Sequence, residues 1–370
     1  MLEENEVDCL IVGQAPPPYH GQAVVTGMLF DHVWTKSRVR LLRMSYSDSI
    51  NEVGRVSLVK VFHLFTLIFQ TWKIVFTQGP KVLYYLPASA NRTPVLRDIV
   101  YLLCVKWCFK RTIYHFHAGG LPAYLESIPV LGKVARFAYG NPDTAIDVID
   151  TLPATGEYFR ARKNVVVNNG VGVALVDRAR PIGARFEAIY VGVLNEGKGV
   201  KDIIETARVM RLQNVECSFI LVGEWVSEIF KEEILGKIND LELKGAFHFT
   251  GALSGNEKWQ AYADADCMLF PSHYEAETFG MVLVEAMAYG LPIVTTNWSG
   301  IPNVVGDCGC AYLCDVKSPE QYADAIIELV EDPILRDEMG KKGQARYEAE
   351  FTKDKFLERM ESVFEEVVHG

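Results

Sequence analysis

The sequence predicts an α/β protein with two doubly wound parallel-sheet domains that face a central cleft. A chain of 370 residues is longer than one hydrophobic core usually supports. Short apolar runs recur along it, each followed by a loop and then by a helical pattern. This series begins at residues 7–12 and restarts after the turn signal at residues 168–170. Because repeated strand–loop–helix units form parallel sheets, we expect domains at residues 1–167 and 168–352.

The first domain opens with a strand at residues 7–12 and a Gly/Pro-rich loop. Gly21 stands at the end of this loop, where the backbone either approaches a ligand closely or only turns. The dinucleotide-binding pattern G-x-G-x-x-G is absent here, so the opening does not indicate NAD.

A later strand of the first domain, at residues 112–116, ends in the sequence HFHAGG, residues 115–120. Since side chains alternate along a strand, His115 and His117 should point to the same face. Ligands of open α/β sheets bind at the carboxyl ends of strands. The two histidines therefore either face a ligand or form a structural pair at the strand end.

Residues 56–77 are strongly apolar but include Lys60, His63 and Lys73. A membrane-spanning helix needs about 20 largely uncharged residues, so spanning is the less favoured interpretation. A helix packed within an α/β domain fits better, as does a helix lying on a bilayer surface.

In the second domain, the loop after a strand at residues 186–193 carries Lys198 between Gly197 and Gly199. Glycines let backbone amides approach a phosphate closely, and the lysine supplies positive charge. The next strand, residues 218–222, ends at Gly223.

The stretch of residues 271–305 is the centre of the second domain. A helix should begin near residues 278–280, and its first N–H groups can bind an anion. Glu277 and Glu285, eight positions apart, can accept hydrogen bonds from vicinal hydroxyls. With Lys198, this set suits a nucleotide diphosphate sugar: a ribose diol, a diphosphate and a hexose. The alternative is an ordinary strand–loop–helix unit with two solvated glutamates.

The net charge of −10 conceals an asymmetry between the two halves. Up to Val165 the chain has 18 basic and 13 acidic residues, which leaves 19 basic and 34 acidic residues for the rest. The basic first half suggests an anionic partner. No Arg-rich helix supports nucleic acid, so an anionic membrane surface or a phosphorylated acceptor fits better.

The cysteines and acidic pairs do not form a metal-binding pattern. The eight cysteines include no C-x-x-C pair, and we expect reduced, mostly buried thiols. Asp264 and Asp266 precede a strand, and we expect them to cap a helix end rather than bind Mg²⁺. The N-terminus lacks the basic and apolar regions of a signal peptide, so a cytoplasmic location is expected.

Residues 271–292, with Glu277 and Glu285 eight positions apart inside them, resemble the E-x7-E signature of retaining GT-B glycosyltransferases of family 4. Other segments resemble the same family along nearly the whole chain. They are PPPYHG (16–21), HFHAGG (115–120), NNGV (168–171), VGVLNEGKG (191–199) and YADADCMLFPS (262–272). The resemblance implies two Rossmann-like domains, with a final helix at about 353–370 that packs back on the first domain.

The resemblance also implies roles for individual residues. Glu285 would bind the ribose diol and Glu277 the hydroxyls of the transferred sugar. The diphosphate would meet Lys198 and the amides that start the helix. The implied donor-binding residues are Gly21, Gly197, Lys198, Gly223, Glu224, Glu277, Thr278, Phe279, Gly280, Met281 and Glu285. The implied catalytic residues are His117, Glu277 and Lys198, and the implied acceptor-side residues are His20, His115 and Gly119.

Two positions depart from the family pattern. Val193 stands where the family usually has an arginine after the glycine that ends the phosphate-loop strand, and Lys201 is one residue that could compensate. His20-Gly21 replaces the Gly-Gly of many members, which affects the acceptor side.

The resemblance implies a retaining, metal-independent glycosyltransferase without a cofactor. A UDP-sugar is favoured as donor, with a GDP-sugar as second choice. The acceptor would be a sugar or a lipid-linked glycan of polysaccharide or glycolipid synthesis, met at the cytoplasmic membrane face. Alternatives are a sugar-nucleotide epimerase and a catalytically weak scaffold, which Val193 favours.

Overall fold

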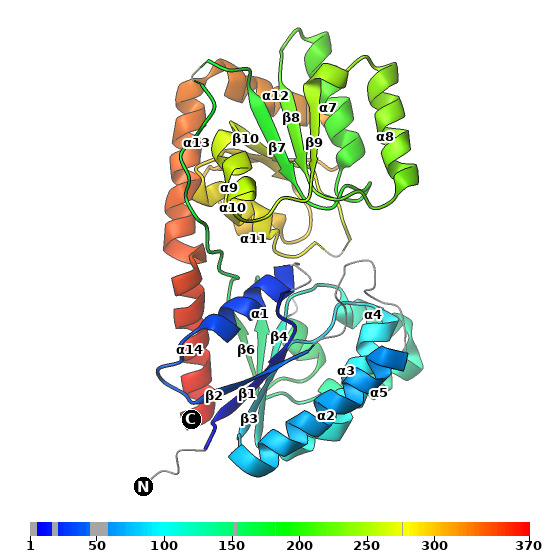
Figure 1. The fold of residues 1–370 in the computed structure, drawn as a ribbon, viewed down its shortest axis with the longest axis vertical. Coiled ribbons are helices and arrows are strands. Elements are labelled where there is room, and N and C mark those ends of the chain that lie inside the picture. Colours follow the sequence, from blue (N-terminus) through cyan, green and yellow to red (C-terminus); the bar gives the residue numbers. More distant parts are fainter. Residues whose placement is uncertain (1–5, 17–20, 45–57, 151–153, 182, 276) are drawn as a thin grey trace. The chain divides into compact units, whose positions relative to one another are not determined.

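A computed structural model of the chain describes residues 6–16, 21–44, 58–150, 154–181, 183–275 and 277–370. They divide into two compact units (Figure 1). Unit 1 comprises Met1–Gly170 and Lys353–Gly370, and unit 2 comprises Val171–Thr352. The predicted domain boundary followed Val167, and the observed division follows Gly170.

Unit 1 contains a six-stranded, all-parallel sheet in the order β2-β1-β3-β4-β5-β6. Its strands are β1 (Cys9–Gly13), β2 (Val39–Arg43), β3 (Val82–Tyr85), β4 (Arg111–Phe116), β5 (Thr144–Asp147) and β6 (Lys163–Val166). The central strands are buried on both faces, as continuous apolar runs such as that of β1 predict.

Helices cover both faces of this sheet. They are α1 (Gly21–Asp31), α2 (Leu58–Gln78), α3 (Arg92–Val105), the 3-10 helix η2 (Lys106–Cys108), α4 (Leu121–Ser127), α5 (Pro129–Tyr139), α6 (Thr155–Tyr158) and α14 (Lys353–His369). The inner sides of α2, α3 and α5 form one core with Leu83 and Tyr85. The alternate side chain, Tyr84, instead meets Phe364 of α14, 5.2 Å between ring centroids.

The last helix, α14, is held on unit 1 by polar and aromatic contacts. His32 and Glu361 lie 2.9 Å apart, and the ring of Trp34 packs 4.7 Å from that of Phe364. Lys163 of β6 also pairs with Glu366. Residues 353–369 therefore belong to the same compact unit as the first strands.

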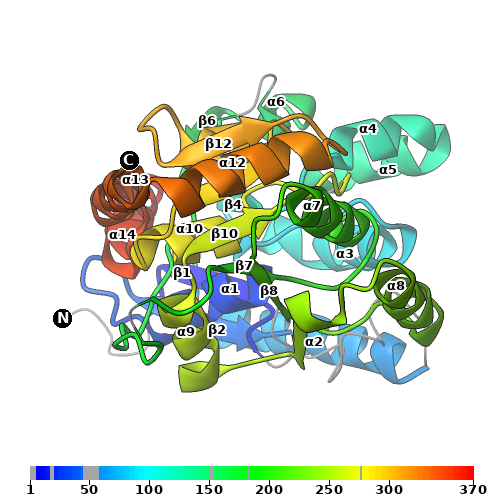
Figure 2. The ribbon, with the colours of Figure 1, turned by 90° about the horizontal axis from the view of Figure 1, so that it is seen from above.

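Unit 2 contains a second six-stranded parallel sheet, in the order β12-β11-β10-β7-β8-β9. Its strands are β7 (Glu187–Val191), β8 (Ser218–Val222), β9 (Phe247–Gly251), β10 (Cys267–Phe270), β11 (Ile293–Thr296) and β12 (Ala311–Cys314). Its helices are α7 (Val200–Leu212), α8 (Glu228–Asp240), η3 (Lys244–Ala246), α9 (Gly255–Asp264), α10 (Met281–Ala288), α11 (Ile301–Val305), α12 (Pro319–Glu331), α13 (Pro333–Arg346) and the π-helix η4 (Tyr347–Phe351). Figure 2 shows α12 beside α7.

The two parallel sheets confirm the predicted α/β class and its two doubly wound domains. The predicted cleft between the domains stays a prediction. The described part of the 56–77 segment lies in α2, whose inner side packs on the sheet of unit 1. By length and composition alone, Val59–Gln78 is also the one helix among the described residues that could cross a membrane.

Candidate functional site

The sheet of unit 2 reverses its strand order between β7 and β10. These strands are neighbours, with Cys267 beside Ala188 and Met268 beside Ile189. Later strands extend the sheet from β10, whereas β8 and β9 extend it from β7. Ligands of open α/β sheets bind at such a switch point, outside the carboxyl ends of the strands. The loops that leave β7 and β10 there, residues 192–199 and 271–280, are those singled out in the sequence.

The centre of this site is an ion pair between the two loops. Lys198 Nζ donates to Glu277 Oε2 at 2.5 Å, and Ser272 Oγ donates to the same oxygen at 3.0 Å. Glu277 is 8% exposed and Ser272 fully buried. The Lys198 ammonium also lies 5.1 Å from the ring centroid of Tyr274. A lysine and a carboxylate are therefore fixed next to each other at the switch point.

The lysine loop keeps its shape through glycine. Gly199 has φ +79°, and a Cβ there would lie 2.2 Å from the carbonyl oxygen of Pro271. The carbonyl of Gly197 accepts from the amide of His273 at 2.9 Å, which ties the two loops together. The Asn195 side chain accepts from the Lys198 amide at 2.8 Å. This close approach of the two backbones fixes the lysine against β10.

The helix α10 starts at the same edge. Gly280 precedes it at φ +63°, no side chain caps it among the described residues, and its first turn has no acidic residue. Phe279 anchors the start: its ring is buried and packs edge-to-face on Phe351 at 5.7 Å. The amide of Leu283 donates to the carbonyl of Gly280 at 2.9 Å, so the amides of Met281 and Val282 are the ones that this positive helix end offers. Thr278 lies in the same loop.

Glu285 is buried on α10 and has two partners on α9. Lys258 Nζ donates to its Oε1 at 2.5 Å, and the Tyr262 hydroxyl donates to its Oε2 at 2.7 Å. Burial, and then the neighbouring Glu285, raise the pKa of Tyr262 well above 10, so the phenol stays a donor. The sequence prediction missed Lys258 and Tyr262, although their i, i+4 spacing on a helix was a signal for one shared face.

The loop after β8 lies next to the lysine loop. Gly223 has φ +150°, and a Cβ there would lie 1.9 Å from the carbonyl oxygen of Gly192. The backbone of Glu224 accepts from the Leu194 amide at 2.8 Å, and its side chain accepts from the Ala252 amide at 3.3 Å. These glycines let the ends of β7 and β8 approach closely.

Val193 is partly exposed in the lysine loop, and its carbonyl accepts from the Tyr190 hydroxyl at 2.9 Å. Whether Lys201 compensates for the missing arginine stays a prediction. Lys201 is bound to Glu196 at 3.1 Å and to Glu233 at 2.7 Å. Its charge is already balanced by two carboxylates.

In unit 1, the two predicted histidines do lie on one face, since the rings of His115 and His117 are 4.1 Å apart. His115 is fully buried, and its Nδ1 lies 2.6 Å from the Tyr84 hydroxyl. Burial, and then His117, hold the pKa of His115 well below 6.5, so its ring is neutral. His115 therefore packs against His117 from inside the sheet. His117 is half-buried, and both of its ring nitrogens are covered by neighbouring atoms.

The other predicted residues of unit 1 lie at helix starts and turns. Gly119 is in the turn between β4 and α4, next to Gly120 at φ +78°. Gly21 is the first residue of α1. His20 lies outside the described residues.

Asp264 and Asp266 have structural partners. Asp264 accepts from the amides of Ala179 and Arg180, at 2.7 and 3.0 Å, and Asp266 pairs with Arg178 at 2.8 Å. Throughout the described ranges, no three His, Cys, Asp or Glu side chains cluster as a metal ion would need.

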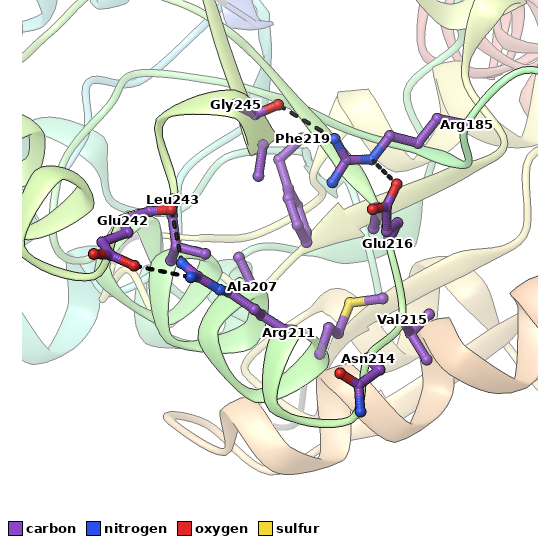
Figure 3. Close-up of a pocket in the computed structure, with 13 residues that line it drawn as sticks. Arg185, Ala207, Arg211, Asn214, Val215, Glu216, Phe219, Glu242, Leu243 and Gly245 are labelled. Carbon is purple, nitrogen blue, oxygen red and sulfur yellow. Dashed lines mark hydrogen bonds and ion pairs between the residues drawn. The ribbon is translucent and has the colours of Figure 1, made fainter.

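A hollow of about 420 Å³ lies at the opposite, amino-terminal edge of β7–β9 (Figure 3). Its polar side chains mainly pair with each other and with backbone: Arg185 faces Glu216 and Gly245, and Arg211 faces Glu242. It contains none of the predicted site residues, and ligands of such sheets bind at the other edge. We therefore base the functional argument on the switch point.

Residues 178–346, within unit 2, match the family model described as "Glycosyl transferases group 1". The match covers just under half of the chain, and it relates unit 2 to a family of sugar-transferring domains. The switch-point loops and both glutamates lie inside the matched stretch.

Curated relatives agree with this class. The chain is 29% identical over 255 residues to the N-acetyl-alpha-D-glucosaminyl L-malate synthase of Bacillus anthracis, which covers 66% of this chain and 65% of that protein. It is 28% identical over 188 residues to the glycogen synthase of Mycobacterium tuberculosis, covering 50% of this chain and 44% of that protein. The chain thus spans less than two thirds of the length of both relatives.

Solved structures share the whole architecture. Sucrose-phosphate synthase from Thermosynechococcus elongatus matches with a TM-score of 0.73 and 17% identity, over 97% of this chain and 99% of that one. The Anabaena protein HepE, solved in complex with UDP, matches with a TM-score of 0.70 and 17% identity, over 96% and 99%. At this identity the likeness concerns the fold alone, which is the GT-B fold.

Proposed function

We propose that this chain is a retaining glycosyltransferase that moves a sugar from a nucleotide diphosphate sugar to a sugar or lipid-linked glycan. The Lys198–Glu277 pair at the switch point of unit 2 carries the proposal. It combines a cation suited to a diphosphate with a carboxylate suited to sugar hydroxyls. A UDP-sugar is favoured over a GDP-sugar, in line with the UDP bound by HepE.

Donor binding would rearrange this pair. A diphosphate offers Lys198 a stronger anionic partner than one carboxylate, and the uncapped start of α10 adds backbone donors. Glu277 Oε2 would then accept from a sugar hydroxyl in place of the ammonium. Glu285, oriented by Lys258 and Tyr262, would accept from the ribose diol.

The chemistry would retain the configuration at the anomeric carbon. The bond between that carbon and the phosphate oxygen breaks, and the acceptor oxygen bonds to the carbon on the same face. The acceptor's proton passes to the leaving phosphate. We do not assign Glu277 as a nucleophile, because its Oε2 would accept from Ser272 and from a sugar hydroxyl in the donor complex. Lys198 and the amides of α10 would stabilise the leaving group without a metal ion or cofactor.

A thermal-shift screen with UDP-, GDP- and ADP-sugars tests donor binding. A donor at about 100 times its Kd should stabilise the protein by about 2.7 kcal/mol, which is an upward Tm shift of about 5–10 °C. Lys198→Met should remove most of this shift. The matched control is Lys201→Met, three residues away and already paired with carboxylates, which should retain it. Equal loss in both variants, or no shift with any sugar nucleotide, contradicts the proposal.

Product analysis tests the mechanism. With a bound donor and an acceptor sugar, NMR should show the anomeric configuration of the donor in the product, and EDTA should leave the rate unchanged. An inverted product contradicts retention, and loss of the rate in EDTA contradicts the metal-free mechanism. His117→Ala tests the catalytic candidate at the end of β4 and should lower kcat while leaving donor affinity unchanged.

A catalytically weak scaffold is the second candidate, because Val193 leaves the lysine loop without an arginine. Donor binding without turnover on any acceptor would favour it. Turnover of the sugar nucleotide alone would favour an epimerase.

We also propose that the acceptor is met at an anionic membrane surface on the cytoplasmic side. The basic first half of the chain and the apolar helix α2 support this part of the proposal.

A further inference from the structure

Five aromatic side chains form an exposed row on α2. Phe62, Phe65, Phe69, Trp72 and Phe76 follow one another at intervals of three, four, three and four residues, which places them on one side of a helix. Their exposure ranges from 39% for Trp72 to 83% for Phe76. We call this row the aromatic stripe.

The stripe is not needed for the core of unit 1. The opposite side of α2 already fills that core, with Leu64, Leu67, Ile68, Thr71 and Ile74. A surface helix of a soluble protein normally presents polar residues on its outer side. A contiguous exposed apolar surface instead marks an interaction site.

The apolar surface continues from α2 across its neighbours. The indole N–H of Trp72 donates to the carbonyl of Cys104 on α3 at 3.1 Å. Beyond the end of α3, the exposed ring of Trp107 lies 6.1 Å from that of Phe137 on α5. Figure 1 shows α2, α3 and α5 next to one another on unit 1. We call the stripe, together with these exposed residues, the apolar face: Leu96, Val100, Trp107, Val130, Val134 and Phe137.

The segments that form the apolar face are basic. Residues 58–78, 92–111 and 129–139 contain nine Lys and Arg residues: Lys60, Lys73, Arg92, Arg97, Lys106, Lys110, Arg111, Lys133 and Arg136. Their one acidic residue is Asp98, which is fully buried and bound by Arg97, Tyr85 and Tyr139. Arg97, Lys106 and Arg111 are bound within the protein. The exposed cations are Lys73, Arg92, Lys110, Lys133 and Arg136, and the three segments expose no carboxylate.

We infer that the apolar face docks on the surface of an anionic lipid bilayer, with α2 lying in the plane of the interface. Aromatic rings favour the boundary between headgroups and acyl chains, and lysines reach anionic headgroups from there. Spanning does not fit, because the inner side of α2 is committed to the protein core. This inference deepens the membrane part of the proposed function and does not depend on the donor site in unit 2.

A second copy of this chain is the competing occupant of the face. A two-fold dimer through the same patch would bring the same basic segments together, with no exposed carboxylate on them to pair with. Like charges at an interface oppose association. Charge complementarity therefore favours an anionic surface.

Vesicle sedimentation tests the inference with the full chain. Wild-type protein should bind vesicles of phosphatidylcholine with 30% phosphatidylglycerol, and high salt should weaken the binding. Phe65→Ser combined with Phe69→Ser should lower partitioning at least tenfold. Lys73→Gln and Lys133→Gln should each lower it about fivefold, which corresponds to about 1 kcal/mol per charge. The matched control, Ile229→Ser with Ile334→Ser, removes two exposed apolar side chains of unit 2 and should change nothing.

Thiol labelling provides an independent readout without substitution. Cys104 and Cys108 are the exposed cysteines of the chain; the others are buried or half-buried. An environment-sensitive dye on these two should shift to the blue with the anionic vesicles, and the vesicles should slow their reaction with maleimide.

Three outcomes would overturn the inference: no binding to anionic vesicles, full binding by the phenylalanine double variant, or a dimer in solution that this variant dissociates. The donor-induced thermal shift of the same variants serves as a folding check. If the thermal shift is intact while vesicle binding is lost, the apolar face is supported as the membrane-binding surface, independently of the reaction that the protein catalyses. If the wild type binds vesicles but no donor, the proposed function fails and this inference stands.

Discussion

A double-mutant cycle on Lys198 and Glu277 tests whether the ion pair at the switch point exists in solution. The cycle compares the wild type with Lys198→Met, with Glu277→Gln and with the double variant. Methionine keeps the length and packing of the lysine stem while it removes the charge. Glutamine keeps the shape of Glu277 and can still accept the hydrogen bond of Ser272.

The expected coupling follows from geometry and burial. The two groups are 2.5 Å apart, Glu277 is 8% exposed, and the side chain of Lys198 is 19% exposed. Hydrogen bonds to charged groups contribute about 1.5–3 kcal/mol. Because water reaches Lys198, we expect the lower part of this range, about 2 kcal/mol. Lys198→Met should cost more than Glu277→Gln, since among the described residues it leaves the buried carboxylate with Ser272 as its remaining side-chain partner.

Urea unfolding of the four proteins, followed by circular dichroism and fitted with separate transitions for the two units, measures the coupling. The control cycle uses Lys201 and Glu233, which are 2.7 Å apart but more exposed. Exposed pairs contribute about 0.2–1 kcal/mol. If the Lys198 and Glu277 effects add within about 0.5 kcal/mol, or couple no more than the control pair, the buried pair does not form in solution.

Two further predictions concern backbone and protonation. Gly199→Ala should destabilise unit 2 by at least about 1–2 kcal/mol from its positive φ alone, and more because Cβ would meet the carbonyl of Pro271 at 2.2 Å. Gly236→Ala, within α8 and with open space at Cβ, should instead stabilise by about 0.5–1 kcal/mol in urea unfolding. For His115, the pKa is depressed in the folded protein, so the unfolded state binds more protons below pH 6.5 and stability falls as the pH falls. Between pH 7.5 and 5.5 this loss of stability is about 1.4 kcal/mol. His115→Asn can still accept from Tyr84, and its stability should depend less on pH by the same amount. An unchanged pH dependence would contradict a neutral His115.

The sequence predicted the strands of unit 2 well where they are mostly buried. Residues 186–193 and 218–222 were predicted as strands, and they contain β7 (Glu187–Val191) and β8 (Ser218–Val222). A strand buried on both faces has a continuous apolar run, and a parallel sheet requires a loop and a helix after it. Local sequence therefore carries both the strand and its end.

Contacts between distant segments could not be predicted in the same way. Lys198 and Glu277 were both predicted as site residues, but their hydrogen bond depends on β7 and β10 being neighbours. Strand order is set by the packing of the whole sheet. Likewise, Lys258 and Tyr262 of α9 meet Glu285 because α9 and α10 pack together, which no local pattern specifies.

The sequence also did not predict which side of α2 is exposed. The apolar run of residues 56–77 is compatible with a packed, an interfacial or a spanning helix, because its apolar residues cover all sides. Only the packing of Leu64 and Ile68 into unit 1 shows which side is occupied. The exposed apolar side is then the side that is free to bind a partner.

The charge of the lysine loop leads to a gain-of-function prediction. Residues 192–199 and 271–280 contain one basic residue, Lys198, and Lys201 is balanced by two carboxylates. Val193 is partly exposed in the same loop, so an arginine can be accommodated there without loss of core packing. Val193→Arg should tighten binding of the diphosphate donor about tenfold, since a charge-assisted hydrogen bond contributes about 1.5–3 kcal/mol before the cost of ordering the side chain.

Calorimetric titration with the donor from the thermal-shift screen measures this effect. Ile334→Arg, at an exposed apolar position on α13, controls for net charge. A larger gain for the Val193 variant, lost again when Lys198→Met is added, would indicate that both cations act on one diphosphate. Equal gains for both arginine variants would attribute the effect to net charge. Unchanged affinity for Val193→Arg would mean that the diphosphate does not approach this loop, and the donor site would have to be sought elsewhere.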